Sequence, residues 1–286
     1  MRKKIGIIVN YLYKNYQLKV LNGIFNTAKR LNTDIFVFVG GNLYQKDIEN
    51  KQRNKIYKLI SEENIHGLII MGLVLGYNIS KSKVLDFYNQ YINQIPIVSL
   101  GLYVEKVPSV VVDNLKGFED LLIHLIKDHE YRNIAFVTGP KNNEDAQKRY
   151  ELFMEITKKH GISISPEFIY EGDFAKLSGI EAVKTFLDKR KIKPQVIVFS
   201  NDMMAIGGIE ELKRRNIKVP EEIAVTGFDN IEESYFVNPT LTTVEQPLSE
   251  LGGKSLELCL SLIEGENFIK HVFLPTKLII RESCGH

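Results

Sequence analysis

The sequence contains little cysteine, no excess of either charge and no long apolar run. The two cysteines, Cys259 and Cys284, lie far apart and without the spacing of metal ligands, which argues against a disulfide framework and favours a reducing compartment. The 37 basic residues nearly balance the 35 acidic ones, so we expect solvated helix ends rather than a DNA-binding patch. The first apolar run, 5–9, is too short for a secretory leader or a membrane span. The sequence therefore predicts a cytoplasmic protein.

Motifs of catalytic and cofactor sites are also missing from the sequence. It has no Walker loop, no dinucleotide-binding glycine pattern, no nucleophile elbow and no H-E-x-x-H. The six histidines are scattered: His124 and His129 flank the end of a predicted helix, whereas His271 and His286 have no partners at ligand spacing. We therefore expect a protein that is not an enzyme and that has no cofactor and no metal site.

Short apolar runs alternate with amphipathic stretches along most of the chain. Such alternation predicts parallel sheets with right-handed helical crossovers, and the Val/Ile-rich runs indicate strands covered by helices on both faces. About five such units precede Val110 and at least four follow it, which favours two doubly wound α/β lobes over a single sheet. The predicted strands cover residues 5–9, 34–39, 67–71, 97–100, 109–112, 133–138, 168–171, 195–199 and 223–226.

The segment 198–245 carries the densest group of candidate binding residues. Two of the predicted strands end there in polar residues, the first in Asn201 and Asp202 and the second in Asp229 and Asn230. Ligands of open parallel sheets bind at the carboxyl ends of strands, where the connecting loops converge. Two amide-plus-carboxylate pairs at neighbouring strand ends can both donate and accept hydrogen bonds. They predict a polar cup for a small molecule rich in hydroxyl or amide groups.

Aromatic and basic residues near other strand ends are further candidates. Tyr11 and Phe174 each follow a predicted strand, and their rings could stack on a sugar or a nucleobase or pack against their own loops. Arg149 lies on the inward face of a predicted helix and could fork hydrogen bonds onto a hydroxyl pair or a carboxylate. It could equally form a structural ion pair with Asp145 or Asp173.

Several segments give the chain a resemblance to a known family. It resembles the effector-binding core of the LacI/GalR family of bacterial transcription regulators, which is itself similar to type I periplasmic sugar-binding proteins. The resemblance covers nearly the whole chain and is densest after Val112. The segments that carry it are V-D-N-L-K-G (112–117), H-L-I (124–126), R-N-I-A-F-V-T-G-P (132–140), G-D-F-A-K-L-S-G (172–179), S-N-D-M-M-A-I-G (200–207), V-P-E-E-I-A-V-T-G-F-D-N (219–230), L-T-T-V-E-Q-P-L-S-E-L-G (241–252) and L-P-T-K-L-I-I-R-E-S-C (274–284).

The resemblance implies two lobes, joined by crossover hinge strands, that close on a small effector in the cleft between them. The lobes would comprise residues 1–112 with 247–266 and residues 113–246 with 267–286. The effector would be a sugar, a sugar phosphate or a nucleobase, and the chain would form a homodimer. Asp202 and Asn230 would cap the following helices instead of touching the ligand. The residues placed at the ligand by the resemblance are Asn10, Tyr11, Arg149, Phe174, Asn201, Asp229 and Gln246.

The chain also departs from the family pattern. Members of the family carry a helix-turn-helix module ahead of this core, whereas here Met1 stands almost directly before the first predicted strand. We therefore expect DNA binding only through a module that this chain lacks. Leu152 stands where the family usually has glycine. The alternatives are a solute-binding protein of a sugar transporter, an enzyme on the same scaffold, and a core that responds to a phosphoprotein partner.

Overall fold

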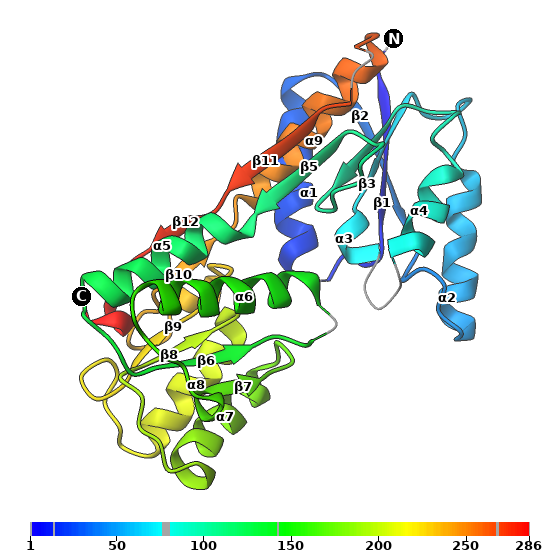
Figure 1. Cartoon of the computed structure of the whole chain (residues 1–286). Helices are drawn as coiled ribbons and strands as arrows, with labels where there is room; N and C mark the ends of the chain where they lie inside the picture. Colours follow the sequence, from blue (N-terminus) through cyan, green and yellow to red (C-terminus); the bar gives the residue numbers. More distant parts are fainter. Residues whose placement is uncertain (1, 14, 76–80, 142, 267–268, 286) are drawn as a thin grey trace. The chain divides into compact units, whose positions relative to one another are not determined.

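The computed structural model describes residues 2–13, 15–75, 81–141, 143–266 and 269–285 (Figure 1). The chain forms two compact units, Met1–Val112 with Pro247–Leu274, and Asp113–Gln246 with Pro275–His286. Each unit has a parallel sheet covered by helices, which confirms the predicted α/β fold class. None of the helices in the described ranges is long and apolar enough to cross a membrane.

The first unit contains a sheet in which the described strands run in the order β11-β5-β4-β3-β1-β2. Strands β1 to β5 pair in parallel, with Ile5 opposite both Ile35 and Gly67. The isoleucine and valine residues of β1 are fully buried, as expected for a central strand of a sheet covered on both faces. The strands are β1 (Lys4–Val9), β2 (Asp34–Val39), β3 (Gly67–Ile70), β4 (Ile97–Leu100), β5 (Ser109–Asp113) and β11 (His271–Pro275).

Helices cover both faces of this first sheet. On one face α1 (Asn15–Arg30) packs against α9 (Leu248–Ile263), so closely that a Cβ atom on Gly23 would collide with the carbonyl oxygen of Ser249. The other face is covered by aromatic residues of η1 (Asn54–Leu59) and α4 (Lys81–Asn89). The remaining helices of the unit are α2 (Ile48–Arg53) and α3 (Gly72–Leu75).

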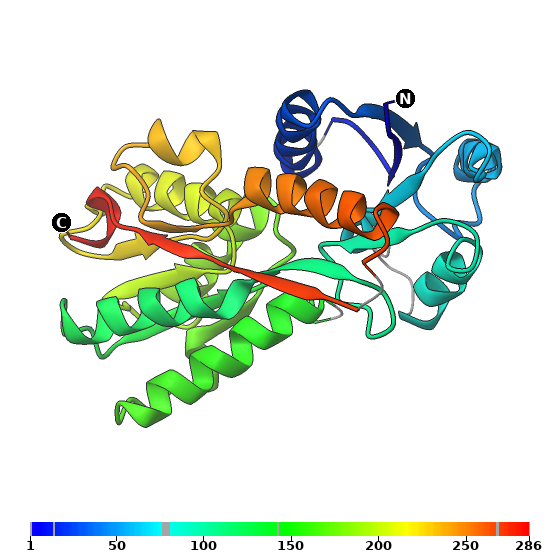
Figure 2. The same cartoon turned by 90° about the horizontal axis from the view of Figure 1, so that it is seen from above.

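The second unit contains a sheet with the strand order β7-β6-β8-β9. Helices lie on both faces of this sheet (Figure 2). Successive side chains of β6 point to opposite faces, so Phe136 packs with α5 and α6 and Val137 packs with α7 and α8. The strands are β6 (Ile134–Thr138), β7 (Ile169–Glu171), β8 (Val196–Phe199) and β9 (Ala224–Thr226). The helices are α5 (Asn114–Lys127), α6 (Glu144–Lys159), α7 (Lys176–Lys184) and α8 (Asp202–Arg214). There are also two short 3-10 helices, η2 (Pro166–Phe168) and η4 (Glu232–Tyr235), and a π-helical segment, η3 (Thr185–Lys189), that continues α7.

The last segment of the chain belongs to both units. Strand β10 (Thr243–Glu245) pairs antiparallel with β12 (Lys277–Ile279) in the second unit, and η5 (Glu282–Cys284) follows. Strand β11, in contrast, lies beside β5 in the first sheet, so the boundary falls between Leu274 and Pro275. The prediction that residues 267–286 all belong to the second lobe needs this correction, because β11 completes the edge of the first sheet.

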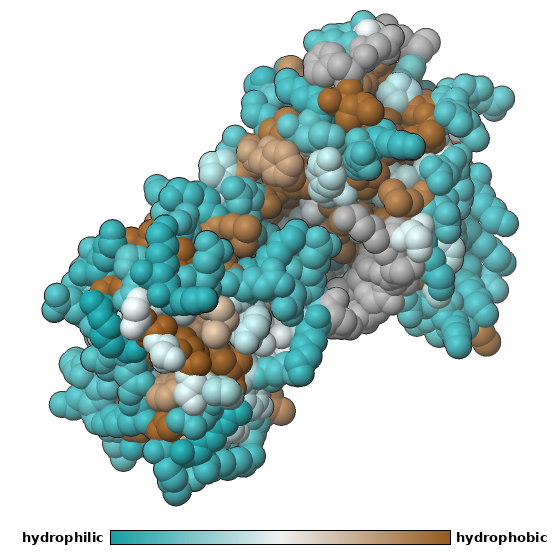
Figure 3. All heavy atoms as spheres, in the orientation of Figure 1, coloured by the Kyte–Doolittle hydropathy of each residue, from teal (hydrophilic) through white to brown (hydrophobic). Residues whose placement is uncertain are grey.

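The face of the molecule drawn in Figure 3 is mostly hydrophilic, with apolar side chains scattered among polar ones. On the first unit, Phe273 of β11 is 58% exposed and its ring stacks on that of Tyr103, with the centroids 6.3 Å apart. Ile269, close to β11 in sequence, is also exposed. Single exposed apolar residues of this kind are common on soluble proteins.

Candidate ligand-binding site

The strand order of the second unit determines where a ligand can bind. The connection after β6 leads to β7 on one side, and the connection after β8 leads to β9 on the other. The strand order therefore reverses between β6 and β8, and open α/β sheets bind ligands at the carboxyl ends of strands at such a point. Four of the predicted site residues follow the carboxyl ends of the four strands of this sheet. Arg149 lies on the helix after β6, Phe174 follows β7, Asn201 follows β8 and Asp229 follows β9.

Arg149 is a buried cation, with only 6% of its surface exposed. It lies in the second turn of α6, a helix that begins where the Asn143 side chain accepts a hydrogen bond from the amide of Ala146 at 2.9 Å. The carbon of its guanidinium lies 4.2 Å from the centre of the Phe228 ring. Burial lowers the pKa of Arg149, whereas the nearby carboxylates of Asp229 and Asp145 act in the opposite direction. Because arginine stays protonated in proteins, the site keeps a positive charge.

The hydrogen bonding of this guanidinium is incomplete. Among the described residues, its buried Nε–H has no hydrogen-bond acceptor. Asp145 is near enough to act on the pKa of Arg149, but among the described residues no ion pair joins the guanidinium to Asp145 or Asp173. A buried donor without an acceptor destabilises a fold by about 1–3 kcal/mol, so an oxygen atom placed against this Nε–H would relieve that cost.

Asp229 and Gln246 are brought together by the structure. The Gln246 amide donates a hydrogen bond from Nε2 to Oδ1 of Asp229 at 2.6 Å, and the backbone N–H of Asp229 donates to the Val244 carbonyl at 2.8 Å. Asp229 has a φ of 113°, a conformation that is strained for residues other than glycine. The neighbouring strand segment therefore holds this carboxylate in an orientation that the isolated loop would avoid.

Asn201 and Phe174 are also linked to each other. Asn201 is the N-cap of α8, since its Oδ1 accepts from the amide of Met204 at 3.1 Å, and its Nδ2 donates to the Phe174 carbonyl at 3.0 Å. Phe174 has a φ of 69° and lies over Gly139, where a Cβ atom would collide with its ring. The predicted capping role of Asp202 is therefore wrong. Asn201 caps the helix because it precedes the first turn with extended backbone angles.

Asp202 instead lies fully buried beneath the loop that follows β9. Its carboxylate oxygens lie 2.9 Å from the amide nitrogen of Ile231 and 2.5 Å from the hydroxyl of Thr243. Burial, together with the nearby charge of Asp229, raises the pKa of Asp202 to about 8. Asp202 therefore joins α8 to Thr243 of β10, and its raised pKa favours the protonated carboxyl group.

In the first unit, Asn10 and Tyr11 follow the carboxyl end of β1, which lies between β2 and β3. Asn10 is buried, and its amide makes four hydrogen bonds within the chain. Its Nδ2 donates to Asn42 Oδ1 and to the Val74 carbonyl, at 2.9 and 3.1 Å. Its Oδ1 accepts from the backbone amide of Tyr11 and from Gln17 Nε2, at 2.8 and 3.0 Å. Tyr11 donates its hydroxyl to Asn50 Oδ1 at 3.1 Å, and its ring lies 5.2 Å from that of Tyr13.

Comparison with known proteins assigns the family. A profile of the periplasmic binding protein-like domain matches residues 123–284, which is more than half of the chain. The chain belongs to this family.

Relatives and solved structures extend this periplasmic binding protein-like assignment. The HTH-type transcriptional repressor CytR of Escherichia coli K12 is 28% identical over 288 residues, which cover 98% of this chain and 79% of CytR. The crystal structure of the Escherichia coli transcriptional repressor ascG has a TM-score of 0.80 at 24% identity and covers 98% of both chains. A lac repressor dimer bound to operator and the anti-inducer ONPF has a TM-score of 0.78 at 22% identity, covering 99% of this chain and 94% of that one.

These findings confirm the resemblance to the effector-binding core of LacI-family regulators. The relatives are transcriptional repressors, which supports a ligand-sensing regulator domain.

In this periplasmic binding protein-like domain, the structure contains one polar network that the sequence did not predict. Arg281 donates from Nη2 to Oδ1 of Asn230 at 2.7 Å and stacks on the Tyr235 ring at 4.0 Å. Asn230 in turn donates from Nδ2 to Oε1 of Glu245 at 3.0 Å. Asn230 and Arg281 are 51 positions apart, and the pairing of β10 with β12 and the bridge between Asp229 and Glu245 bring their segments together.

Proposed function

We propose that this domain senses a sugar or sugar derivative at the carboxyl-end edge of the second sheet, and that Arg149 and Asp229 make the central polar contacts. The buried Nε–H of Arg149, which has no acceptor among the described residues, carries the proposal. A ligand oxygen that accepts from this group would relieve its desolvation, and the guanidinium can offer a second parallel donor to an adjacent oxygen.

The charges around Arg149 favour a neutral polyol over a simple anion. Asp229 lies close enough to affect the pKa of Arg149, so an anionic ligand near the guanidinium would also meet this carboxylate. Neighbouring hydroxyl groups of a sugar can accept from the guanidinium and donate to the carboxylate at the same time. The half-buried Phe174 ring supplies an aromatic face of the kind that packs against the apolar side of a sugar ring.

We extend the proposal to the first unit and to regulation. Tyr11 would contact the ligand from the loop after β1, whereas Asn10 would hold that loop in place through its four hydrogen bonds. Ligand held in this way between the two units would favour a closed arrangement of a homodimer by population shift. A helix-turn-helix module joined to this core would then change its affinity for DNA. Similarity to repressors, one of them solved as a dimer on its operator, supports this part.

A thermal-shift screen followed by calorimetry tests the proposal. Sugars, sugar phosphates, nucleosides and purine bases are added to the purified chain, and a selective ligand at ~100 times its Kd should add about 2.7 kcal/mol of stability. Replacing Arg149 by Met should then weaken binding of that ligand by about 2–5 kcal/mol, because the Asp229 carboxylate loses its cation and the ligand oxygens lose their donors. Asp229→Asn should weaken it by a smaller amount.

The matched control is Arg190→Lys in the same unit. Arg190 also lies near an aromatic ring, 5.6 Å from the centre of Phe186, but it bonds the carbonyls of Glu167 and Ile169 around the start of β7. Ligand affinity should be unchanged in this variant. An unchanged affinity in Arg149→Met would show that the ligand binds elsewhere.

A further inference from the structure

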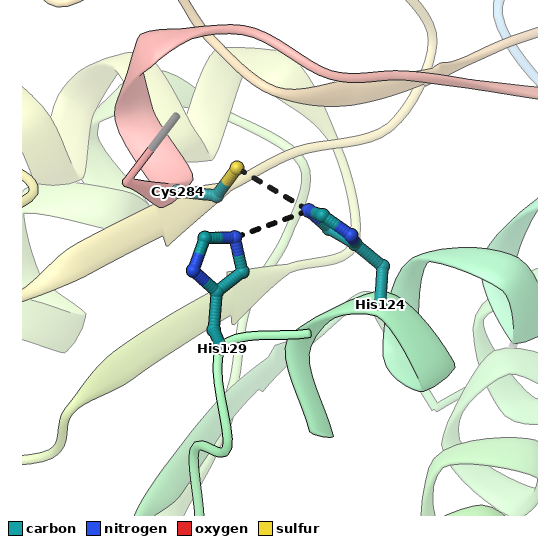
Figure 4. A group of neighbouring side chains, drawn as sticks. All are labelled: His124, His129 and Cys284. Carbon is teal, nitrogen blue, oxygen red and sulfur yellow. Dashed lines mark hydrogen bonds between the residues drawn. The ribbon is translucent and has the colours of Figure 1, made fainter. Parts of the chain in front are cut away.

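Two histidines and a cysteine meet in the second unit, away from the ligand site proposed above. His124 lies in the last turn of α5, His129 follows just after that helix, and Cys284 ends η5 near the C-terminus (Figure 4). Nε2 of His124 lies 3.2 Å from Nε2 of His129 and 3.7 Å from Sγ of Cys284. One donor atom from each of the three residues falls within 4.8 Å of the other two.

The two separations measured from Nε2 of His124 match those of ligands around one tetrahedral ion. With metal–nitrogen bonds of about 2.05 Å and a metal–sulfur bond of about 2.3 Å, tetrahedral angles place two nitrogens about 3.3 Å apart and a nitrogen and a sulfur about 3.6 Å apart. The observed 3.2 Å and 3.7 Å are both within about 0.2 Å of these values. Imidazole and thiolate together are the ligand types that Zn²⁺ prefers.

The groups around the three side chains orient them as metal ligands require. The Asp128 carboxylate lies 2.7 Å from Nδ1 of His124, so a proton on Nδ1 leaves Nε2 with a lone pair toward the other two residues. The Tyr131 ring stacks on His129 at 5.3 Å with only 10° between the planes, and its hydroxyl donates to the Cys284 carbonyl at 3.1 Å. The Thr242 hydroxyl lies 3.1 Å from the Cys284 sulfur.

Burial leaves the cluster closed on one side and accessible on the other. His124 and Cys284 are buried, at 4% and 0% exposed, whereas His129 is half-buried and gives an ion a path from solvent. A hydrogen bond between the two imidazoles and an adjacent thiol accounts for the same separations without an ion. The two interpretations can be told apart by metal binding. Only a metal site predicts that the thiolate and both imidazoles coordinate the same ion.

We propose that His124, His129 and Cys284 bind one divalent zinc-type ion, which fastens the C-terminal turn η5 to the end of α5. The fourth position of the ion is left for a water molecule or another small ligand. The sequence predicted no metal site, because Cys284 lies 155 or more positions from either histidine and no motif joins the three residues. The proposal is independent of the sugar site, since none of its three ligands follows the carboxyl end of a strand of the second sheet.

Cobalt substitution of the whole chain tests this proposal. The chain is purified without a histidine tag, stripped of metal under reducing conditions and titrated with Co²⁺. One equivalent should produce tetrahedral d–d absorption together with a thiolate-to-cobalt charge-transfer band, and Zn²⁺ should displace it. Absence of the charge-transfer band in the wild-type protein would overturn the proposal without any variant being needed.

Variants then identify the ligands. Cys284→Ser and His129→Asn should each weaken Zn²⁺ binding by more than ~100-fold, and Asp128→Asn, which leaves all three ligands in place, by about 10–100-fold. Cys259→Ala and His160→Asn are the controls, because Cys259 is buried in the first unit and His160 ends α6. Both controls should bind Zn²⁺ like the wild type. Equal affinity in the wild type and in Cys284→Ser would refute the site.

Discussion

The two units have sheets of the same local topology, but the polar residues at the carboxyl ends of their strands bond differently. In both, the first strand of the unit lies between the second and the third, as β2-β1-β3 and as β7-β6-β8. At this edge the first unit has Asn10, whose amide makes four hydrogen bonds within the chain. The second unit has Arg149, which is equally buried but has an Nε–H without an acceptor among the described residues.

The proposed function gives these two buried residues different roles, Asn10 in the fold and Arg149 at a ligand. A carboxamide has two N–H donors and two acceptor lone pairs, so four hydrogen bonds exhaust the capacity of Asn10. A guanidinium has five donors and no acceptor, and Arg149 leaves part of that capacity unused in a buried place. We infer that the first unit supplies a fixed loop and that the second unit supplies most of the polar recognition.

The largest effect on stability is expected from Asn10→Ala. The substitution removes the partner of four groups, among them the buried Nε2 of Gln17, and should lower the free energy of unfolding of the first unit by about 2–3 kcal/mol. Arg149→Met, which replaces a buried charge by a flexible apolar chain of similar length, should change the stability of the second unit by less than about 1 kcal/mol. Hydrogen exchange across a urea series, read by mass spectrometry on peptides of each unit, measures the two values separately.

Asn42→Ala is a useful companion to Asn10→Ala, because it removes only one of the four partners. It should lower stability by about 1 kcal/mol. If Asn10→Ala and Arg149→Met had equal effects on stability, the distinction between the two edges would fail.

The next prediction concerns pH, where the two units should also differ. Burial and the charge of Asp229 raise the pKa of Asp202 from 3.8 to about 8, against the opposing charge of Arg281. Between these values the folded state holds one more proton than the unfolded state. The free energy of unfolding of the second unit should therefore fall as pH rises, by at most about 1.4 kcal/mol per pH unit, and the stabilisation is lost above pH 8.

The buried tyrosines of the first unit should not make its free energy of unfolding depend on pH in this range. Burial raises the pKa of Tyr57 and of Tyr88 even above the ordinary tyrosine value, so both stay neutral between pH 5 and pH 8. Asp202→Asn should flatten the pH dependence of the second unit and leave that of the first unit unchanged. The same hydrogen-exchange measurement at pH 5 and pH 8 checks this, and an unaltered slope in the variant would show that Asp202 is ionised throughout.

The sequence predicted the features that local patterns encode. Alternating apolar runs indicated the strands and helices of both sheets, and polar residues after those runs placed Asn201 and Asp229 at strand ends, where the structure has them. It assigned the helix cap to Asp202, one residue too late, because side chains of both residues can cap and only the backbone angles of Asn201 decide between them.

Contacts between distant segments were beyond prediction from the sequence. The hydrogen bond from Arg281 to Asn230 and the meeting of Cys284 with His124 both depend on how the last segment packs on the second sheet. The same holds for the missing acceptor of Arg149, since a sequence shows which groups can pair but not which of them fail to. The place of β11 could not be predicted either. It follows α9 and lies beside β5 at the edge of the first sheet.

The smallest effect should come from an ion pair on the surface of the first unit. Arg30 of α1 and Glu257 of α9 approach to 2.7 Å, but their side chains are 61% and 36% exposed, so solvent screens the attraction. Glu257→Gln should therefore lower the stability of the first unit by less than about 0.5 kcal/mol.

Gly23→Ala, in contrast, tests the packing of the same two helices, because the new methyl group would collide with the carbonyl oxygen of Ser249 and overpacking costs about 1–3 kcal/mol. Urea denaturation of both variants measures the two effects side by side, and a larger loss for Glu257→Gln would mean that charge rather than close packing joins α1 to α9.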